Sequence, residues 1–106
     1  MSFTGNEDQS ISLTTAAAWT KNYRNSVPTG TTIGSYYGGS AISAILAQSA
    51  CVGIRIYYAI DDSGNKQFVI VGVDSNENDL YNGLLAEHGL PCPSYCSSAN
   101  PLNTTM

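Results

Sequence analysis

The sequence predicts an α+β fold with two N-terminal helices, a central antiparallel β-hairpin, a short third helix and an irregular, proline-rich C-terminal tail. Residues 51–60 alternate apolar and other side chains with the two-residue period of a strand. Residues 68–73 are mostly β-branched or aromatic, which is also typical of strands. Residues 61–66, between them, are rich in turn formers. The hairpin therefore carries most of the expected core.

Two helices are expected before the hairpin. Ser12 is placed to cap a helix that ends near Asn25, because its apolar residues recur at helical spacing. The shared face of this helix is formed by Leu13, Ala16, Trp19, Thr20 and Tyr23. Ser40 is placed to cap a second helix, which turns Ile42, Ile45 and Leu46 to one face. Pro28 and two glycines make residues 25–37 an expected linker.

The expected strand register follows from a four-residue loop, residues 62–65. This loop pairs Ile54 with Val73. Successive residues then point to opposite faces of the ribbon, and both faces are apolar. One face contains Ile54, Ile56, Tyr58, Val69, Val71 and Val73. The other contains Tyr57, Ala59, Phe68 and Ile70. Since a helix covers only one face, we expect the second face to be a self-assembly surface.

The remaining chain completes a single small domain, residues 1–106. Residues 1–10 form an expected N-terminal arm and residues 97–106 an expected C-terminal tail. Asn78 or Asp79 is placed to cap the short third helix, and Gly89 is placed to end it.

Composition and charge exclude several function classes. Only 11% of the residues are charged and the net charge is −4, with the four basic residues scattered along the chain. No basic patch for nucleic acid is present in the sequence, and no apolar run approaches the roughly 20 residues of a membrane span. The polar opening MSFTGNED is unlike a signal peptide, so a cytoplasmic location is expected. If the chain leaves the cell, the sequence does not show the route.

Cysteine and histidine provide the only candidate metal ligands. Cys92 and Cys96 follow His88 at four-residue spacing, and Cys51 can complete a set of four. The alternatives are a Cys92–Cys96 disulfide in an oxidising setting and reduced cysteines packed as small apolar side chains, and the last is favoured. No catalytic constellation, cofactor motif or small-molecule site is recognisable, so the chain is not expected to be an enzyme.

Four pieces of the chain together form a distinctive pattern. They are ISLTTAAAWTKNYR, GGSAISAILAQ, CVGIRIYYAIDDSGNKQFVIVGVD and PCPSYC. The pattern resembles a family of small uncharacterised bacterial proteins of the Bacteroidetes type, and it spans residues 11–96. The resemblance implies no activity, cofactor or catalytic residue, and it implies a chain without a signal peptide.

The favoured functional hypothesis is a structural subunit that assembles with copies of itself into a homo-oligomer or filament. Sparse charge, two apolar hairpin faces and open strand edges motivate it. The first alternative is a protein-binding or regulatory module that uses the pairs Tyr36–Tyr37 and Tyr57–Tyr58 as its contact surface. The second is a small enzyme with Cys51 or His88 as the reacting group.

Overall fold

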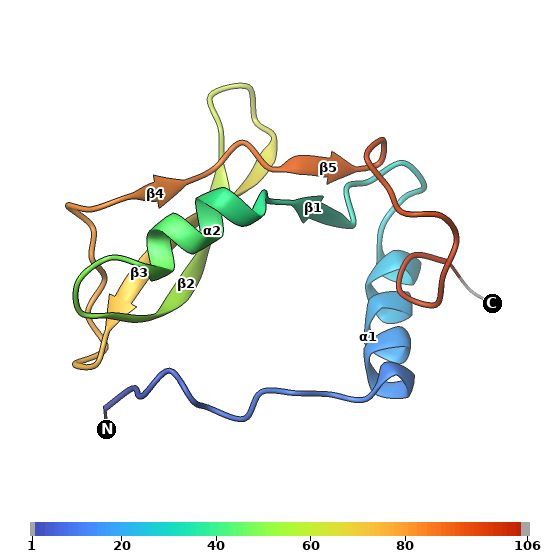
Figure 1. Ribbon diagram of the computed structural model, residues 1–106. Coiled ribbons are helices and arrows are strands. Elements are labelled where there is room, and N and C mark those ends of the chain that lie inside the picture. The colour runs from blue at the N-terminus through green and yellow to red at the C-terminus, as the bar shows by residue number, and fades with distance from the viewer. Residues whose placement is uncertain (1, 105–106) are drawn as a thin grey trace. The chain divides into compact units, whose positions relative to one another are not determined.

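The computed structural model describes residues 2–104 and has an α+β architecture with two helices and antiparallel sheets (Figure 1). This coarse prediction is confirmed. The elements are α1 (Leu13–Ser26), β1 (Gly34–Tyr36), α2 (Gly39–Leu46), β2 (Cys51–Ile60), β3 (Lys66–Asp74), β4 (Leu85–Ala86) and β5 (Leu90–Cys92). The chain divides into two compact units. The described part of the hairpin unit is residues 2–8 and 37–89, and that of the α1 unit is residues 9–36 and 90–104.

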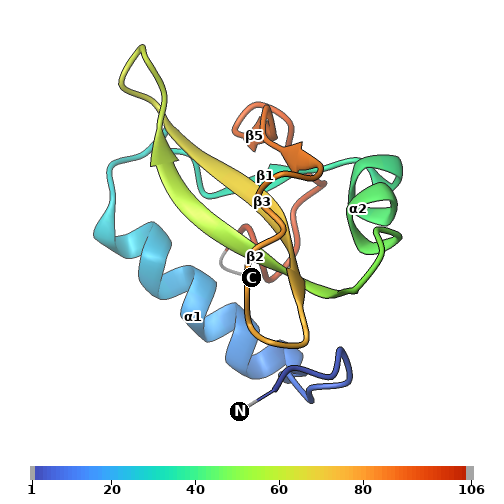
Figure 2. The ribbon, with the colours of Figure 1, turned by 90° about the vertical axis from the view of Figure 1, so that its left-hand side faces the viewer.

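The hairpin unit is a sheet in the order β2-β3-β4 with α2 packed against it. Figure 2 shows β2 and β3 as a long twisted ribbon with α2 beside it. Ile45 of α2 is only 1% exposed, and its Cγ2 lies 3.4 Å from the position that a Cβ at residue 72 would take. Gly72 therefore allows α2 to approach the sheet closely. The buried apolar side chains of the described residues are Ile45, Ile70, Val71 and Val73.

The predicted register is wrong by one residue. Ile60 pairs with Lys66, so the loop contains five residues, Asp61 to Asn65, instead of four. The Asp61 carboxylate accepts hydrogen bonds from the backbone N–H groups of Ser63 and Asn65, both at 2.9 Å. The Asp61 carbonyl also accepts a hydrogen bond from Gly64 N at 3.0 Å, so side-chain and backbone acceptors of one residue together stabilise the five-residue loop.

The changed register divides the predicted self-assembly surface between two faces. Residues that stand opposite each other in an antiparallel pair point to the same face. The observed pairs that place the four residues are Tyr57 with Val69, Ala59 with Gln67, Tyr58 with Phe68 and Ile56 with Ile70. Tyr57 and Ala59 thus lie on one face of the hairpin, and Phe68 and Ile70 lie on the other.

The predicted third helix is absent from the described residues. The segment after β3 instead returns along β3: Asp79 forms a β-bridge with Val73, and β4 pairs with residues 70 and 71. Gln48 accounts for part of this difference, because its Oε1 accepts a hydrogen bond from Leu84 N at 2.8 Å. A long-range contact thus overrides the local helical pattern, which Gly83 already weakens.

In the α1 unit the first helix agrees with its prediction. The Ser12 side chain caps α1 by accepting a hydrogen bond from Thr15 N. Two other predictions in this part of the chain are wrong. The linker contains β1, which pairs with β5 in the proline-rich tail. The second helix, α2 of the hairpin unit, begins at Gly39 after an N-cap Gly38 that makes no side-chain hydrogen bond, so Ser40 lies inside the helix.

Candidate self-assembly surface on β2

The long strand β2 lies at the edge of the three-stranded sheet. One side of β2 pairs with β3. Among the described residues, no backbone hydrogen bond joins residues 54–60 to any segment other than β3 and the adjoining turn. An edge of this kind presents unpaired backbone N–H and C=O groups that a further strand can pair with.

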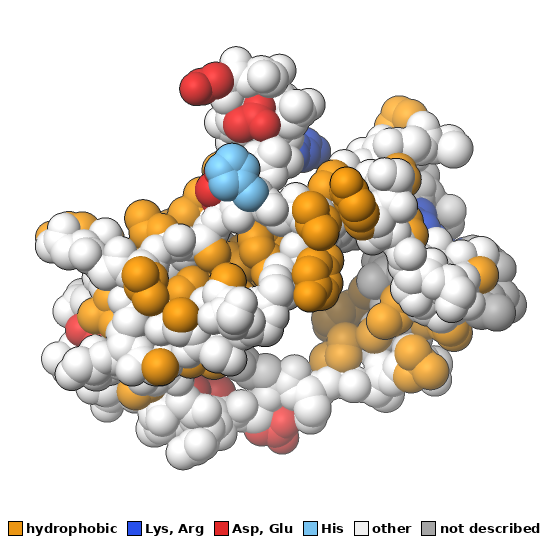
Figure 3. Space-filling model, turned by 45° about the horizontal axis from the view of Figure 1, so that its top comes forward, with side chains coloured by type: hydrophobic (Ala, Val, Ile, Leu, Met, Phe, Trp, Pro, Cys, Tyr) orange, Lys and Arg blue, Asp and Glu red, His pale blue; other side chains and the backbone are white. Residues whose placement is uncertain are grey.

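One face of this edge strand carries a row of exposed apolar side chains. We call it the β2 row, and it consists of Ile54, Ile56, Tyr58 and Ile60, with exposed fractions of 38%, 50%, 90% and 73%. The ring of Tyr58 lies 5.8 Å, centroid to centroid, from that of Phe68, its cross-strand partner on the same face. Figure 3 shows hydrophobic side chains over much of the visible surface, and few charged side chains there.

The opposite face of β2 holds its only charged side chain. Arg55 pairs with the Asp79 carboxylate, which also accepts a hydrogen bond from the Tyr57 hydroxyl. The hydrogen bond to Asp79 raises the pKa of Tyr57, and the same partner raises the pKa of Arg55. The charge of β2 is therefore matched within the hairpin unit, and the β2 row itself is uncharged.

The residues predicted as the self-assembly surface occupy different environments. Ile70 is buried, and Phe68 is half-buried, with its carbonyl accepting a hydrogen bond from the Tyr37 hydroxyl at 3.2 Å. Burial and the nearby Glu87 raise the pKa of Tyr37. Tyr57 points to the face that carries Arg55, so the pair Tyr57–Tyr58 divides between the two faces of the strand. Sequence reasoning thus placed an exposed apolar face on the hairpin but assigned the wrong residues to it.

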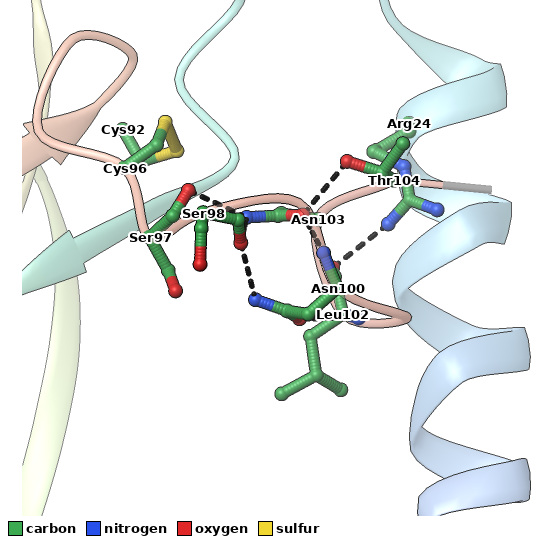
Figure 4. The surroundings of a disulfide bond; sticks show 9 residues. All are labelled: Arg24, Cys92, Cys96, Ser97, Ser98, Asn100, Leu102, Asn103 and Thr104. Atoms are coloured by element: carbon green, nitrogen blue, oxygen red, sulfur yellow. Dashed lines mark hydrogen bonds between the residues drawn. A yellow bond between two sulfur atoms is a disulfide. The ribbon is translucent and has the colours of Figure 1, made fainter. Parts of the chain in front are cut away.

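The candidate metal ligands do not form a site in the described residues. Cys92 and Cys96 form a disulfide in the α1 unit (Figure 4), which is the alternative to the favoured prediction of reduced cysteines. Cys51 is a free cysteine of the hairpin unit, and its thiol lies 3.2 Å from the carbonyl oxygen of Gly53. His88 is highly exposed and contacts Glu87. Disulfides persist in oxidising surroundings and are rare in the cytoplasm, so the disulfide gives no support to the predicted cytoplasmic location.

Asparagine side chains hold the chain that follows the disulfide (Figure 4). The side-chain amide of Asn103 donates to the carbonyls of Ser97 and Ser98, and its oxygen accepts a hydrogen bond from Asn100 N at 2.9 Å. Arg24 of α1 donates to the Leu102 carbonyl at 2.8 Å. The predicted C-terminal tail, residues 97–106, therefore has specific contacts within its described part, and residues 105 and 106 lie outside it.

No family model, curated protein or solved structure matches the chain. The resemblance to a bacterial family therefore stays a prediction. Within the described residues, no helix is both long enough and apolar enough to cross a membrane.

Proposed function

We propose that the protein is a structural subunit that assembles with copies of itself through the exposed edge of β2. The observation that carries this proposal is the β2 row, a set of uncharged apolar side chains on a ten-residue edge strand. Natural sheets usually protect such an edge with charges, proline or a covering segment. Residues 54–60 contain no proline, and their one charged side chain, Arg55, is already paired with Asp79 on the opposite face.

The small core supports the same proposal. Four buried apolar side chains among the described residues are few for a chain of this length. Small domains with little buried apolar area commonly gain stability from disulfides or from oligomerisation. Burying the β2 row against a second copy removes further apolar surface from water at about 25 cal/mol per Å².

The sequence of β2 is suited to pairing with its own copy. An antiparallel pair centred on Tyr57 places Ile56 opposite Tyr58 and Ile54 opposite Ile60. Such apolar cross-strand pairs stabilise a sheet by about 0.2–1 kcal/mol each. The same register places Arg55 opposite Ala59, so the two arginines do not face each other. A contact of this symmetry uses the same surface on both subunits.

Replacement of Tyr58 by Lys tests the proposal. Tyr58 is 90% exposed, so the change costs the single hairpin unit little, whereas β2 pairing would place the new charge beside the apolar side chains of the second copy without a partner. We expect wild-type protein to show a mass that rises with concentration in analytical ultracentrifugation. We expect Tyr58→Lys to show a smaller mass than the wild type at each concentration, because β2 pairing is lost, with an unchanged circular dichroism spectrum.

The matched control is Tyr81→Lys. Tyr81 is 72% exposed and lies outside the strands, so this variant makes the same chemical change away from the β2 edge. We expect it to assemble like the wild type. A wild-type protein that stays monomeric at all concentrations, or equal loss of assembly in both variants, would reject the proposal and favour a protein-binding module.

A further inference from the structure

Residues 2–8 belong to the hairpin unit although the chain that follows them belongs to the α1 unit. This arm contacts the end of the hairpin at which β2 begins and β3 ends. Phe3 N donates a hydrogen bond to Ser75 O at 2.9 Å. Gly5 lies against Val52 so closely that a Cβ there would be 2.6 Å from the Val52 carbonyl oxygen. We call Val52 and Ser75 the arm seat.

The arm holds its own shape. The Glu7 carboxylate accepts hydrogen bonds from Thr4 N at 2.8 Å and from Gly5 N at 3.0 Å. Asn6 N donates to the Thr4 hydroxyl at 3.0 Å. These contacts all lie within residues 4–7, and we call the turn that they form the hook. A preformed element of this kind loses little conformational entropy when it binds.

The arm seat is shaped for a glycine backbone. Gly5 has a φ of +84°, a region that other residues rarely adopt, and the approach of Val52 O leaves no room for a side chain. Val52 occupies an irregularity in the β2–β3 register, between Cys51 and Gly53. The arm seat therefore accepts glycine at position 5 and excludes residues with a side chain.

We propose that the arm exchanges between copies, so that the arm seat of one subunit takes residues 2–8 of a second subunit. Twenty-eight residues of the α1 unit, 9–36, separate the arm from the remainder of the hairpin unit along the chain, so the arm is not continuous with the strands that it contacts. Exchange of an identical element between protomers makes the same contacts at low cost.

This inference rests on the proposed self-assembly and deepens it. Pairing between two β2 edges consumes both edges and closes as a dimer. Arm exchange is a head-to-tail contact in which the donor and the acceptor surfaces differ, so it can continue from one subunit to the next. The two contacts together produce an extended assembly. β2 pairing alone gives a dimer, and arm exchange alone gives subunits linked head to tail.

Engineered disulfides test the exchange. A backbone hydrogen bond brings residues 3 and 75 within the range of Cα separations that disulfides span. We mix a chain carrying Phe3→Cys with a chain carrying Ser75→Cys, both with Cys51→Ala, under mild oxidation. We expect a covalent dimer on non-reducing gels. Replacing Ser75→Cys by Tyr81→Cys, an exposed position outside the arm seat, is expected to give at least tenfold less dimer.

A chain that carries both Phe3→Cys and Ser75→Cys tests whether the arm binds the seat of its own subunit. If it forms only an internal bond while the mixed chains form none, the arm binds its own seat and the proposal is overturned. If neither sample forms a bond, the contact itself is absent in solution and the proposal is overturned as well.

A glycine pair supplies the matched control for the arm. Gly5→Val in the Phe3→Cys chain is expected to abolish the covalent dimer, because the side chain collides with Val52 O. Gly30→Val introduces the same residue at a similar φ of +93° with nothing within 4 Å, so it is expected to leave the dimer intact. Equal yields with both variants would mean that Gly5 does not bind the arm seat.

The experiment separates this inference from the proposed function. In a Tyr58→Lys background, β2 pairing is expected to be lost while the covalent dimer still forms. A covalent dimer together with equal masses for the wild type and Tyr58→Lys at every concentration would reject β2 pairing alone. Mass growth without a covalent dimer would reject arm exchange alone.

Discussion

Glu7 determines whether the arm keeps its hook. The N–H group of Thr4 is the main cause that lowers the pKa of this carboxyl below its ordinary value of 4.5. A group whose pKa is lower in the folded arm stabilises the fold above its unfolded pKa and loses that effect as pH falls through the folded value. The hook should therefore be intact at neutral pH and should open in acid.

Amide NMR checks this expectation. We expect the Thr4 and Gly5 amide resonances to move toward random-coil positions together as the solution is taken from about pH 6 to about pH 3. Glu7→Gln should remove this pH dependence, because the amide does not titrate in that range. Amides that stay unchanged in the wild type down to the lower pH would show that the carboxylate does not hold the hook.

Single polar side chains also explain what the sequence did not reveal. The composition of residues 61–66 predicted a turn, but it did not show which side chain would close it. Asp61 accepts from two backbone N–H groups, and Gln67 also donates to its other oxygen and is the main cause that lowers the pKa of Asp61. The one-residue change of register places Phe68 and Ile70 on the face that carries the β2 row, which the turn composition did not reveal.

At the scale of elements, an isoleucine of α2 is buried and an isoleucine of β2 is exposed. Ile45 is 1% exposed against the sheet, whereas Ile60 at the turn end of the β2 row is 73% exposed. We expect Ile45→Ala to lower the free energy of unfolding by about 2–5 kcal/mol, the usual cost of truncating a buried isoleucine. Ile60→Ala should change it by about 0.5 kcal/mol or less.

Urea unfolding in the Tyr58→Lys background measures the two costs without β2 pairing. Working in that background matters because assembly would bury Ile60 and add to its apparent cost. Similar losses in the two variants would contradict the packing of α2 on the sheet. A large loss for Ile60→Ala alone would show that the β2 row is internal to the single chain.

Local patterns were sufficient for some elements and insufficient for others. The helical spacing after Ser12 and the strand alternation of residues 51–60 predicted α1 and β2, because each pattern is complete within its own segment. The segment that forms β4 looks helical by itself. It becomes extended because Gln48, far away in sequence, binds Leu84 N. Long-range contacts of this kind leave no trace in a local pattern.

At the scale of the whole molecule, the disulfide should act on one unit only. Cys92 and Cys96 close a five-residue loop within the α1 unit. A loop of that size corresponds to about 2 kcal/mol in the chain-entropy model. We expect Cys92→Ser with Cys96→Ser to destabilise the α1 unit by about that amount and to leave the hairpin unit unchanged.

Two probes follow the units separately. Trp19 is the only tryptophan of the chain and lies in α1, so its fluorescence reports the α1 unit. Amide exchange of Ile70 and Val71 reports the hairpin unit, because both residues are buried in β3. Equal shifts in both probes would mean that the units unfold together.

The pairing of β1 with β5 has a practical consequence. Tyr36 stands opposite Leu90, so the chain enters and leaves residues 37–89 at neighbouring points. A segment whose two ends are adjacent can be spliced into a surface loop of a host protein without forcing the host's loop apart. Residues 37–89 are therefore suited to insertion as one segment, which would display the uncharged β2 row on the host protein.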